Sequence, residues 1–190
     1  MQKRLLLILA IVSCSSSEPL SDTERPSEAE KPSETVLTRD SSAPIQTDSL
    51  SYTLKRDALG WATRIPFTYR NPTADTIYVV NCNRTLAMAL EQRAGDAWRT
   101  NWHPALPVCL SAPVVIAPGA VYVDTMAIFG APPGRNVAPE FGDTTFTGTY
   151  RLVWHNLVTH YRTDAGANFG GAVPLEYRYS NEFVLRKAKP

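Results

Sequence analysis

The amino-acid sequence predicts an all-β fold, an antiparallel β-sandwich of about seven strands behind a disordered linker. From about Leu50 onward, short runs of alternating apolar and polar residues recur, and turn signals separate them. No stretch sustains the 3.6-residue period of an amphipathic helix. Residues 51–190 provide about the length of one domain with one core. Short strands at regular intervals are typical of a β-sandwich.

The expected strands follow one another with clear turn residues between them. The run WATRIPFTYR (61–70) places Trp61, Ile65 and Tyr69 on one face of a strand. The turn NPTAD leads to further strands in TIYVVNC, TLAMALEQR and WRTNW. A Pro-Gly turn at 118–119 precedes a strand around residues 122–128, and GTYRLVWH and SNEFVLR complete the set.

The order of these segments resembles that of bacterial immunoglobulin-like domains. RNPTADTIYV, ALEQRAGDAWR, IAPGAVYV, GTYRLVW and SNEFVL are similar to the intracellular proteinase-inhibitor (BsuPI-like) type over about residues 60–187. The resemblance implies an immunoglobulin-like sandwich, and it implies an envelope proteinase inhibitor as an alternative function. Tyr150 opens a strand two residues after Gly148, so its hydroxyl either bonds a nearby backbone group, as in a tyrosine corner, or simply fills the core.

The first residues resemble the signal of a bacterial lipoprotein. Lys3 and Arg4 precede the apolar run Leu5–Val12, which is too short for the roughly 20 residues of a membrane-spanning helix. The run ends in Ile-Val-Ser-Cys, similar to a lipobox, which implies that residues 1–13 are removed and that Cys14 is acylated. The same resemblance implies the outer membrane, since Ser and not Asp follows Cys14. An ordinary secretory signal with an incidental cysteine is the alternative.

Residues 14–50 are expected to be a disordered tether between the lipid and the domain. Residues 15–50 contain nine Ser, four Pro and no aromatic residue, and their eight acidic and three basic side chains give a net charge of −5. Residues 51–190 carry 14 basic and 10 acidic side chains, a net charge of +4. This charge is too small and too scattered in the sequence to predict a nucleic-acid partner.

The remaining cysteines, Cys82 and Cys109, predict a disulfide. Two cysteines in an exported domain more often form a bond than remain as free thiols. The alternative is a metal site that includes the nearby His103, but the further ligands that such a site needs are not evident in the sequence. We therefore expect no metal ion and no cofactor.

No sequence motif indicates catalysis. There is no Gly-x-Ser-x-Gly elbow, P-loop or GxGxxG motif, and His155 and His160 are five residues apart, so they point to opposite faces of a strand. A pair of distant carboxylates stays open as a third possibility, that of a hydrolase. We expect a protein that is not an enzyme.

Two long connections are the expected binding regions. Residues 130–145 and 157–178 both exceed ordinary hairpin loops in length. The second contains Tyr161, Arg162, Phe169 and Tyr177, a mixture of aromatic residues and Arg that is enriched at binding hot spots. The sequence thus predicts a membrane-anchored binding module whose partners are the membrane, through Cys14, and an unidentified envelope protein or glycan.

Overall fold

The structure of the protein, a computed structural model, describes residues 37–106, 111–162 and 168–189. The chain divides into a unit up to Thr35 and a compact unit from Val36 to Pro190. The compact unit is all-β, with a single short 3-10 helix, η1 (Leu175–Tyr177), among the described residues. None of these residues forms a helix that is long and apolar enough to cross a membrane. The predicted all-β, sandwich-like fold is confirmed.

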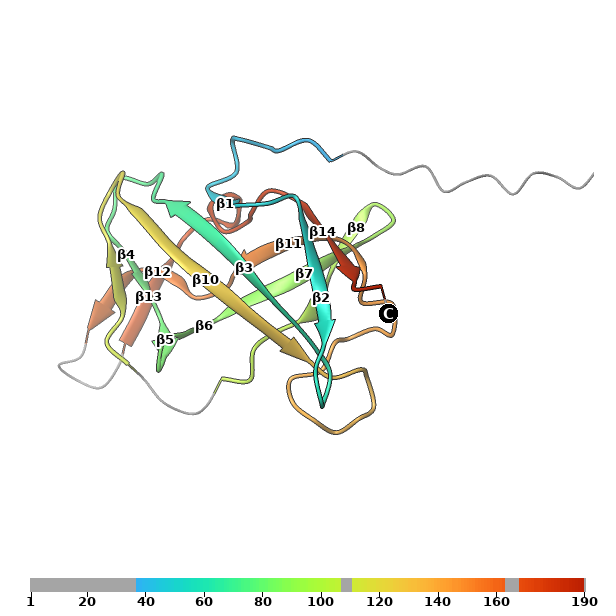
Figure 1. Cartoon of the computed structure of the whole chain (residues 1–190). Coiled ribbons are helices and arrows are strands. Elements are labelled where there is room, and N and C mark those ends of the chain that lie inside the picture. Colours follow the sequence, from blue (N-terminus) through green and yellow to red (C-terminus); the bar gives the residue numbers. More distant parts are fainter. Residues whose placement is uncertain (1–36, 107–110, 163–167, 190) are drawn as a thin grey trace, which may run out of the picture. The chain divides into compact units, whose positions relative to one another are not determined.

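The front layer in Figure 1 is built on two ten-residue strands, which pair in antiparallel fashion along their whole length. These are β3 (Trp61–Arg70) and β10 (Val121–Gly130). The short β1 (Ile45–Thr47) pairs with the other edge of β3. Because Ile45 and Thr47 are fully buried, the globular part begins earlier than the boundary at residue 51 that composition predicts.

The back layer continues the same sheet through β2 (Ser51–Arg56). One end of β2 pairs with β3, and its first residues pair with the last strand, so this strand passes from one layer to the other. The back strands follow in the order β14 (Phe183–Lys187), β11 (Gly148–Trp154), β7 (Met88–Ala94) and β8 (Ala97–Trp102). The β2–β14 pairing is parallel, whereas the sequence predicts an entirely antiparallel sandwich.

A second sheet of four short strands closes one end of the layers. It runs in the order β13 (Asn168–Ala172), β12 (Leu157–Arg162), β4 (Ile77–Val79) and β9 (Val114–Ile116). A small hairpin of β5 (Asn81–Cys82) and β6 (Thr85–Leu86) lies between β4 and β7 along the chain. The described strands exceed the seven expected for two reasons. TIYVVNC and TLAMALEQR each form two strands, and β1, β2, β12 and β13 lie in segments where no strand is predicted.

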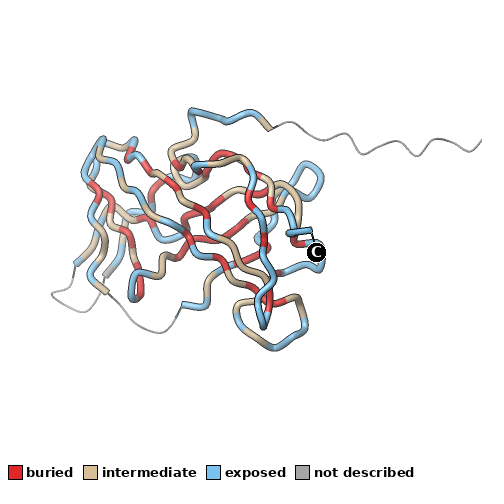
Figure 2. Tube along the Cα trace, in the orientation of Figure 1, coloured by how far each residue is buried: buried red, intermediate tan, exposed pale blue. Residues whose placement is uncertain are grey.

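The core lies between the two layers, and Figure 2 shows buried residues on the strands of both. Aromatic side chains from both layers meet there. The indole of Trp154, from the back layer, is in edge contact with Phe67 and Tyr69 of β3, at ring-centroid distances of 5.7 and 5.5 Å. The Tyr122 ring of β10 lies 5.9 Å from the same indole. The alternation read from WATRIPFTYR therefore does place Ile65, Phe67 and Tyr69 in the core.

Candidate functional site

The four residues predicted to form one binding loop lie in two places. Residues 157–162 and 168–172 are strands of a hairpin and not a loop, so the expectation of a long irregular connection is wrong. Tyr161 and Phe169 are cross-strand partners with ring centroids 5.3 Å apart, and Tyr161 also lies 6.1 Å from Tyr78 of β4. Arg162 is exposed beside them, whereas Tyr177 belongs to η1 and packs against the core.

The predicted lipid and disulfide sites fall largely outside the described residues. Cys14 and Cys109 lie there, so the structure tests neither the acylation nor the bond. Cys82 is described, in β5, and only 3% of its surface is exposed. A buried thiol or half-cystine at this position is compatible with the predicted Cys82–Cys109 pair, which stays a prediction.

The histidines lie apart on the surface. His103, His155 and His160 are all exposed. Within residues 37–106, 111–162 and 168–189, no three His, Cys, Asp or Glu side chains come together in a way that could hold a metal ion.

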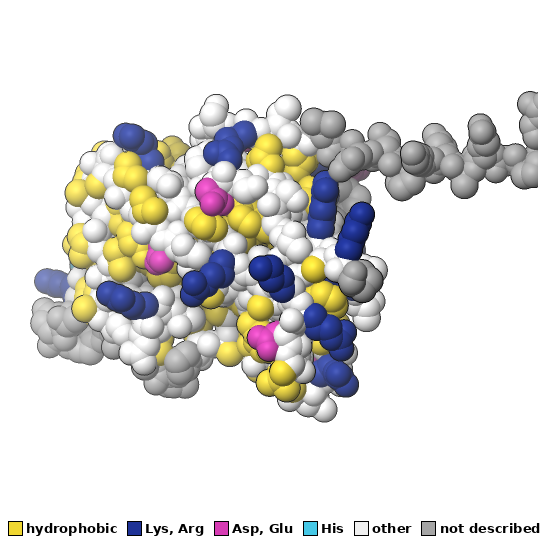
Figure 3. Space-filling model, viewed as in Figure 1, with side chains coloured by type: hydrophobic (Ala, Val, Ile, Leu, Met, Phe, Trp, Pro, Cys, Tyr) yellow, Lys and Arg dark blue, Asp and Glu magenta, His cyan; other side chains and the backbone are white. Residues whose placement is uncertain are grey.

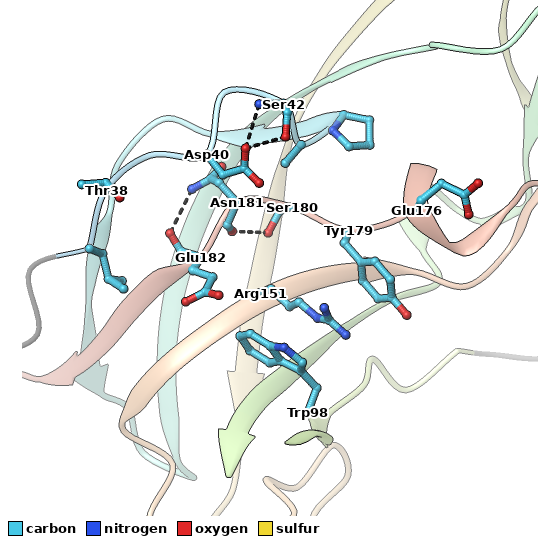
Figure 4. Close-up of a pocket in the computed structure, with 13 residues that line it drawn as sticks. Thr38, Asp40, Ser42, Trp98, Arg151, Glu176, Tyr179, Ser180, Asn181 and Glu182 are labelled. Atoms are coloured by element: carbon cyan, nitrogen blue, oxygen red, sulfur yellow. Dashed lines mark hydrogen bonds between the residues drawn. The ribbon is translucent and has the colours of Figure 1, made fainter. Parts of the chain in front are cut away.

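A hollow lined by polar and aromatic side chains lies on the outer side of the back layer. It has a volume of about 520 Å³. Trp98 of β8, Arg151 of β11 and Tyr179, after η1, form one wall, and the turn around Asp40–Pro44 forms another (Figure 4). We call this hollow the Trp98 pocket. Its lining combines residues from near the start of the described chain (37–44) with residues from near its end (176–182).

Arg151 is held rigidly inside the Trp98 pocket. Its Nε and Nη2 donate to the Glu91 Oε2 at 2.8 and 2.6 Å, across the β11–β7 pair. Its guanidinium lies 4.4 Å from the Trp98 ring centroid and 3.7 Å from that of Tyr179 (Figure 4). Only 18% of the Arg151 side chain and 15% of the Glu91 side chain are exposed, so water screens this ion pair weakly. Stacking and ion pairing thus fix one wall before any ligand arrives.

Carboxylates dominate the charge of the pocket lining. The lining contains three carboxylates, those of Asp40, Glu176 and Glu182, and one guanidinium, that of Arg151. Glu182 also pairs with Arg93 at 2.5 Å, on the outside of the pocket. The Ser42 hydroxyl and amide donate to the Asp40 carboxylate, and these hydrogen bonds lower the pKa of Asp40. The carboxylates of the lining offer acceptors to a ligand that carries donors or a cation.

A buried amide supports the connection between β10 and β11. The Asn101 Oδ1 accepts from the amides of Gly142 and Asp143 at 2.8 and 3.1 Å. Its Nδ2 donates to the Tyr150 hydroxyl at 3.0 Å and to the Gln92 side chain. Tyr150 therefore bonds a side chain and not the backbone group of a tyrosine corner. Burial raises the pKa of Tyr150.

Sequence reasoning missed the residues of the Trp98 pocket. Trp98, Arg151 and Tyr179 are far apart in the chain, and each stands in a segment that alternation explains as a strand or its end. The feature of the sequence that could have indicated such a site is the excess of Arg among the basic residues, because the Arg guanidinium stacks on aromatic rings and forms bidentate hydrogen bonds with carboxylates. The partners of each Arg, however, depend on strand register.

Comparison with protein-family models, with curated proteins and with solved structures finds no match to this chain. The lipobox and BsuPI-like resemblances therefore stay predictions, and the function rests on the chemistry of the surfaces described above.

Proposed function

We propose that this protein is a lipid-anchored, non-enzymatic binding module that uses the Trp98 pocket to hold an envelope protein or glycan. The observation that carries the proposal is the pre-organised wall, in which Arg151 is fixed between two aromatic rings and an ion-paired Glu91. A wall that is already rigid loses little conformational entropy on binding, which favours affinity. The carboxylates opposite favour a ligand group that is cationic or rich in hydroxyl donors.

The anchor belongs to the proposal and is supported by the Ile-Val-Ser-Cys sequence. Acyl chains on Cys14 bury many CH₂ groups at about 0.8 kcal/mol each, and more than one chain makes an anchor stable. The proposed tether starts at Cys14 and ends before the folded part of the chain, which the structure describes from residue 37. It holds the domain near an outer membrane, where the Cys82–Cys109 bond forms in an oxidising compartment. Labelled palmitate should enter the wild-type chain and not the Cys14→Ala variant; lipid on the variant would refute the anchor.

Capture from intact cells tests the binding function. The lipidated chain is crosslinked mildly, purified, and compared with Glu176→Lys and with Asp75→Lys, an exposed carboxylate outside the pocket. We expect the recovered partner to fall at least tenfold in Glu176→Lys and to persist in the Asp75→Lys control. Equal capture by both variants would show that the partner does not bind at the Trp98 pocket.

An envelope proteinase inhibitor is the second candidate, and the connection after β10 favours it. The Glu140 carboxylate accepts from the amides of Gly134 and Val137 at 3.1 and 3.3 Å, and these bonds, that of Gly134 foremost, lower the pKa of Glu140. Arg135 is exposed at the tip of this braced loop. A rigid exposed loop suits a substrate-like inhibitor, because little entropy is lost on docking.

Assays against a panel of serine proteinases separate the two functions. An inhibitor should slow a proteinase that cleaves after Arg, and Arg135→Ala should remove the effect. No inhibition by the wild-type chain would leave the binding module as the function.

A further inference from the structure

One edge of the front layer has no strand beside it in the part of the chain that the structure describes. β10 pairs with β3 through all ten of its residues, from Val121 opposite Arg70 to Gly130 opposite Trp61. It pairs with no other described strand. The other edge of β10 is thus unpaired with any strand among the described residues; we call it the β10 edge.

Hydrogen bonds on the far side of β3 show which residues point toward the β10 edge. The Arg70 amide donates to the Pro44 carbonyl at 3.1 Å, and the Pro66 carbonyl accepts from an amide of the β1–β2 connection at 3.2 Å. Both residues of β3 thus direct their main chain away from β10. In an antiparallel pair, their partners Val121 and Thr125 must also point away from β3.

Main-chain groups therefore face the β10 edge at every second residue, from Val121 to Phe129. The Phe129 carbonyl accepts from the Trp102 Nε1 at 2.8 Å, and the Thr125 amide donates to the Asp124 carboxylate at 2.7 Å, which agrees with this direction. Among the described residues, no hydrogen bond reaches the main chain of Val123 or Ala127 on this side. These groups are free to bond another strand.

A groove runs along the β10 edge. Two adjoining hollows, of about 820 and 180 Å³, share Arg84, Leu86 and Asp124 in their linings. Together they follow β10 from Tyr122 to Ala127, a length of about 20 Å for six extended residues. The space beside the strand is long enough for an added strand.

The side chains of β10 do not protect its edge. Val121 and Val123 are 50% and 68% exposed. On the side of the domain drawn in Figure 3, apolar groups lie at the surface among Lys and Arg side chains. Natural edge strands are usually protected by Lys, Pro, bulges or short length. β10 has none of these, and its one charged residue, Asp124, bonds the Tyr122 hydroxyl at 2.5 Å. An open, apolar edge of this kind predicts strand addition.

We propose that two copies of this chain pair in antiparallel fashion through their β10 edges. Self-pairing near Thr125 sets Val123 against the small Ala127 of the second copy and covers the exposed valines. Charge does not oppose it, because Arg84 lies in the groove beside Asp124. The two-fold axis of such a pair stands perpendicular to the sheet, so both copies keep the same face on one side, and both fit one membrane. The pairing does not depend on the Trp98 pocket.

Sedimentation of the unlipidated full chain, Cys14→Ser, tests this pairing. We expect a monomer–dimer equilibrium that Val123→Lys weakens at least tenfold, because Lys at an edge disfavours pairing. Ala127→Pro removes an amide that faces the β10 edge, so it should weaken the dimer as well. Leu59→Lys is the control: Leu59 is a similarly exposed residue in the β2–β3 turn, and its replacement should leave the dimer intact. Hydrogen exchange should slow at the Val123 and Ala127 amides as concentration rises.

Two results would overturn the proposal. One is that the chain is a monomer at every concentration, which includes the case in which a foreign peptide, and not a second copy, protects the β10 amides. The other is a dimer that neither edge variant weakens.

Discussion

Arg151 contributes both to the stability of the back layer and to the shape of the Trp98 pocket. Its ion pair with Glu91 crosses from β11 to β7, and the same guanidinium stacks on Trp98 and Tyr179. A weakly exposed ion pair has lost much of its hydration, so removing one partner leaves an uncompensated charge. The same residue therefore supports both folding and the binding surface.

Arg151→Met should lower the free energy of unfolding by about 2–4 kcal/mol, because Glu91 stays partly buried without a partner. Arg93→Met is the matched control. The Arg93 side chain is 45% exposed, and its pair with Glu182 should contribute less than about 1 kcal/mol. Urea unfolding followed by fluorescence measures both. Equal losses in the two variants would contradict the difference in burial.

Buried tyrosines predict loss of stability in alkali. Burial, and then the hydrogen bond to Asp48, raises the pKa of Tyr52 to about 12, and burial raises the pKa of Tyr69, Tyr122 and Tyr150. The folded state then holds these protons more tightly than the unfolded state, so the free energy of unfolding falls as pH rises above about 10. Absorbance at 295 nm should show that these four buried tyrosines ionise only as the protein unfolds. Ionisation of all of them near pH 10 in folded protein would refute this.

At the scale of elements, the β12–β13 hairpin shows why the sequence predicts a loop where the structure has two paired strands. The Gly-rich sequence DAGANFGG and the weak alternation around it are typical of a loop. β12, however, pairs with β4, a strand some 80 residues earlier, and sequence periodicity carries no information about such a pairing. Gly171 has a φ of +65°, and a Cβ there would collide with the Thr159 hydroxyl, so glycine permits the close pairing of β13 with β12.

The double variant Tyr161→Ser, Phe169→Ser tests the hairpin. The two rings are cross-strand partners, and Phe169 is 36% exposed, so their loss should cost about 1–2 kcal/mol in the free energy of unfolding. Tyr161→Phe keeps the ring contact and should cost little. A loss above about 4 kcal/mol would show that the rings are part of the core.

At the scale of the whole molecule, the strong alternating runs predict the layers well. β3, β10, β11 and β14 lie where WATRIPFTYR, VYVDTMAIF, GTYRLVW and EFVLR indicate. The parallel β2–β14 pair and the four-stranded end sheet could not be predicted, because both depend on contacts between distant segments. The Trp98 pocket has the same origin, since strand register alone brings Trp98 and Arg151 together.

The proposed bond between Cys82 and Cys109 constrains the whole domain. Thiol titration of the denatured, unreduced chain carrying Cys14→Ser should find no free sulfhydryl. Reduction should lower the melting temperature, because losing such a bond typically costs about 2–5 kcal/mol in an exported domain. Two reactive thiols would exclude the bond.

Site-specific photo-crosslinking from the pocket rim tests the central claim most directly. Benzoylphenylalanine replaces Thr38, which is exposed and lines the Trp98 pocket, or Asp75, which is exposed outside it. In intact cells, the chain should form one discrete adduct from position 38, which Trp98→Ser removes, and none from position 75. An adduct of equal yield from position 75, or one that survives Trp98→Ser, would contradict binding at the pocket.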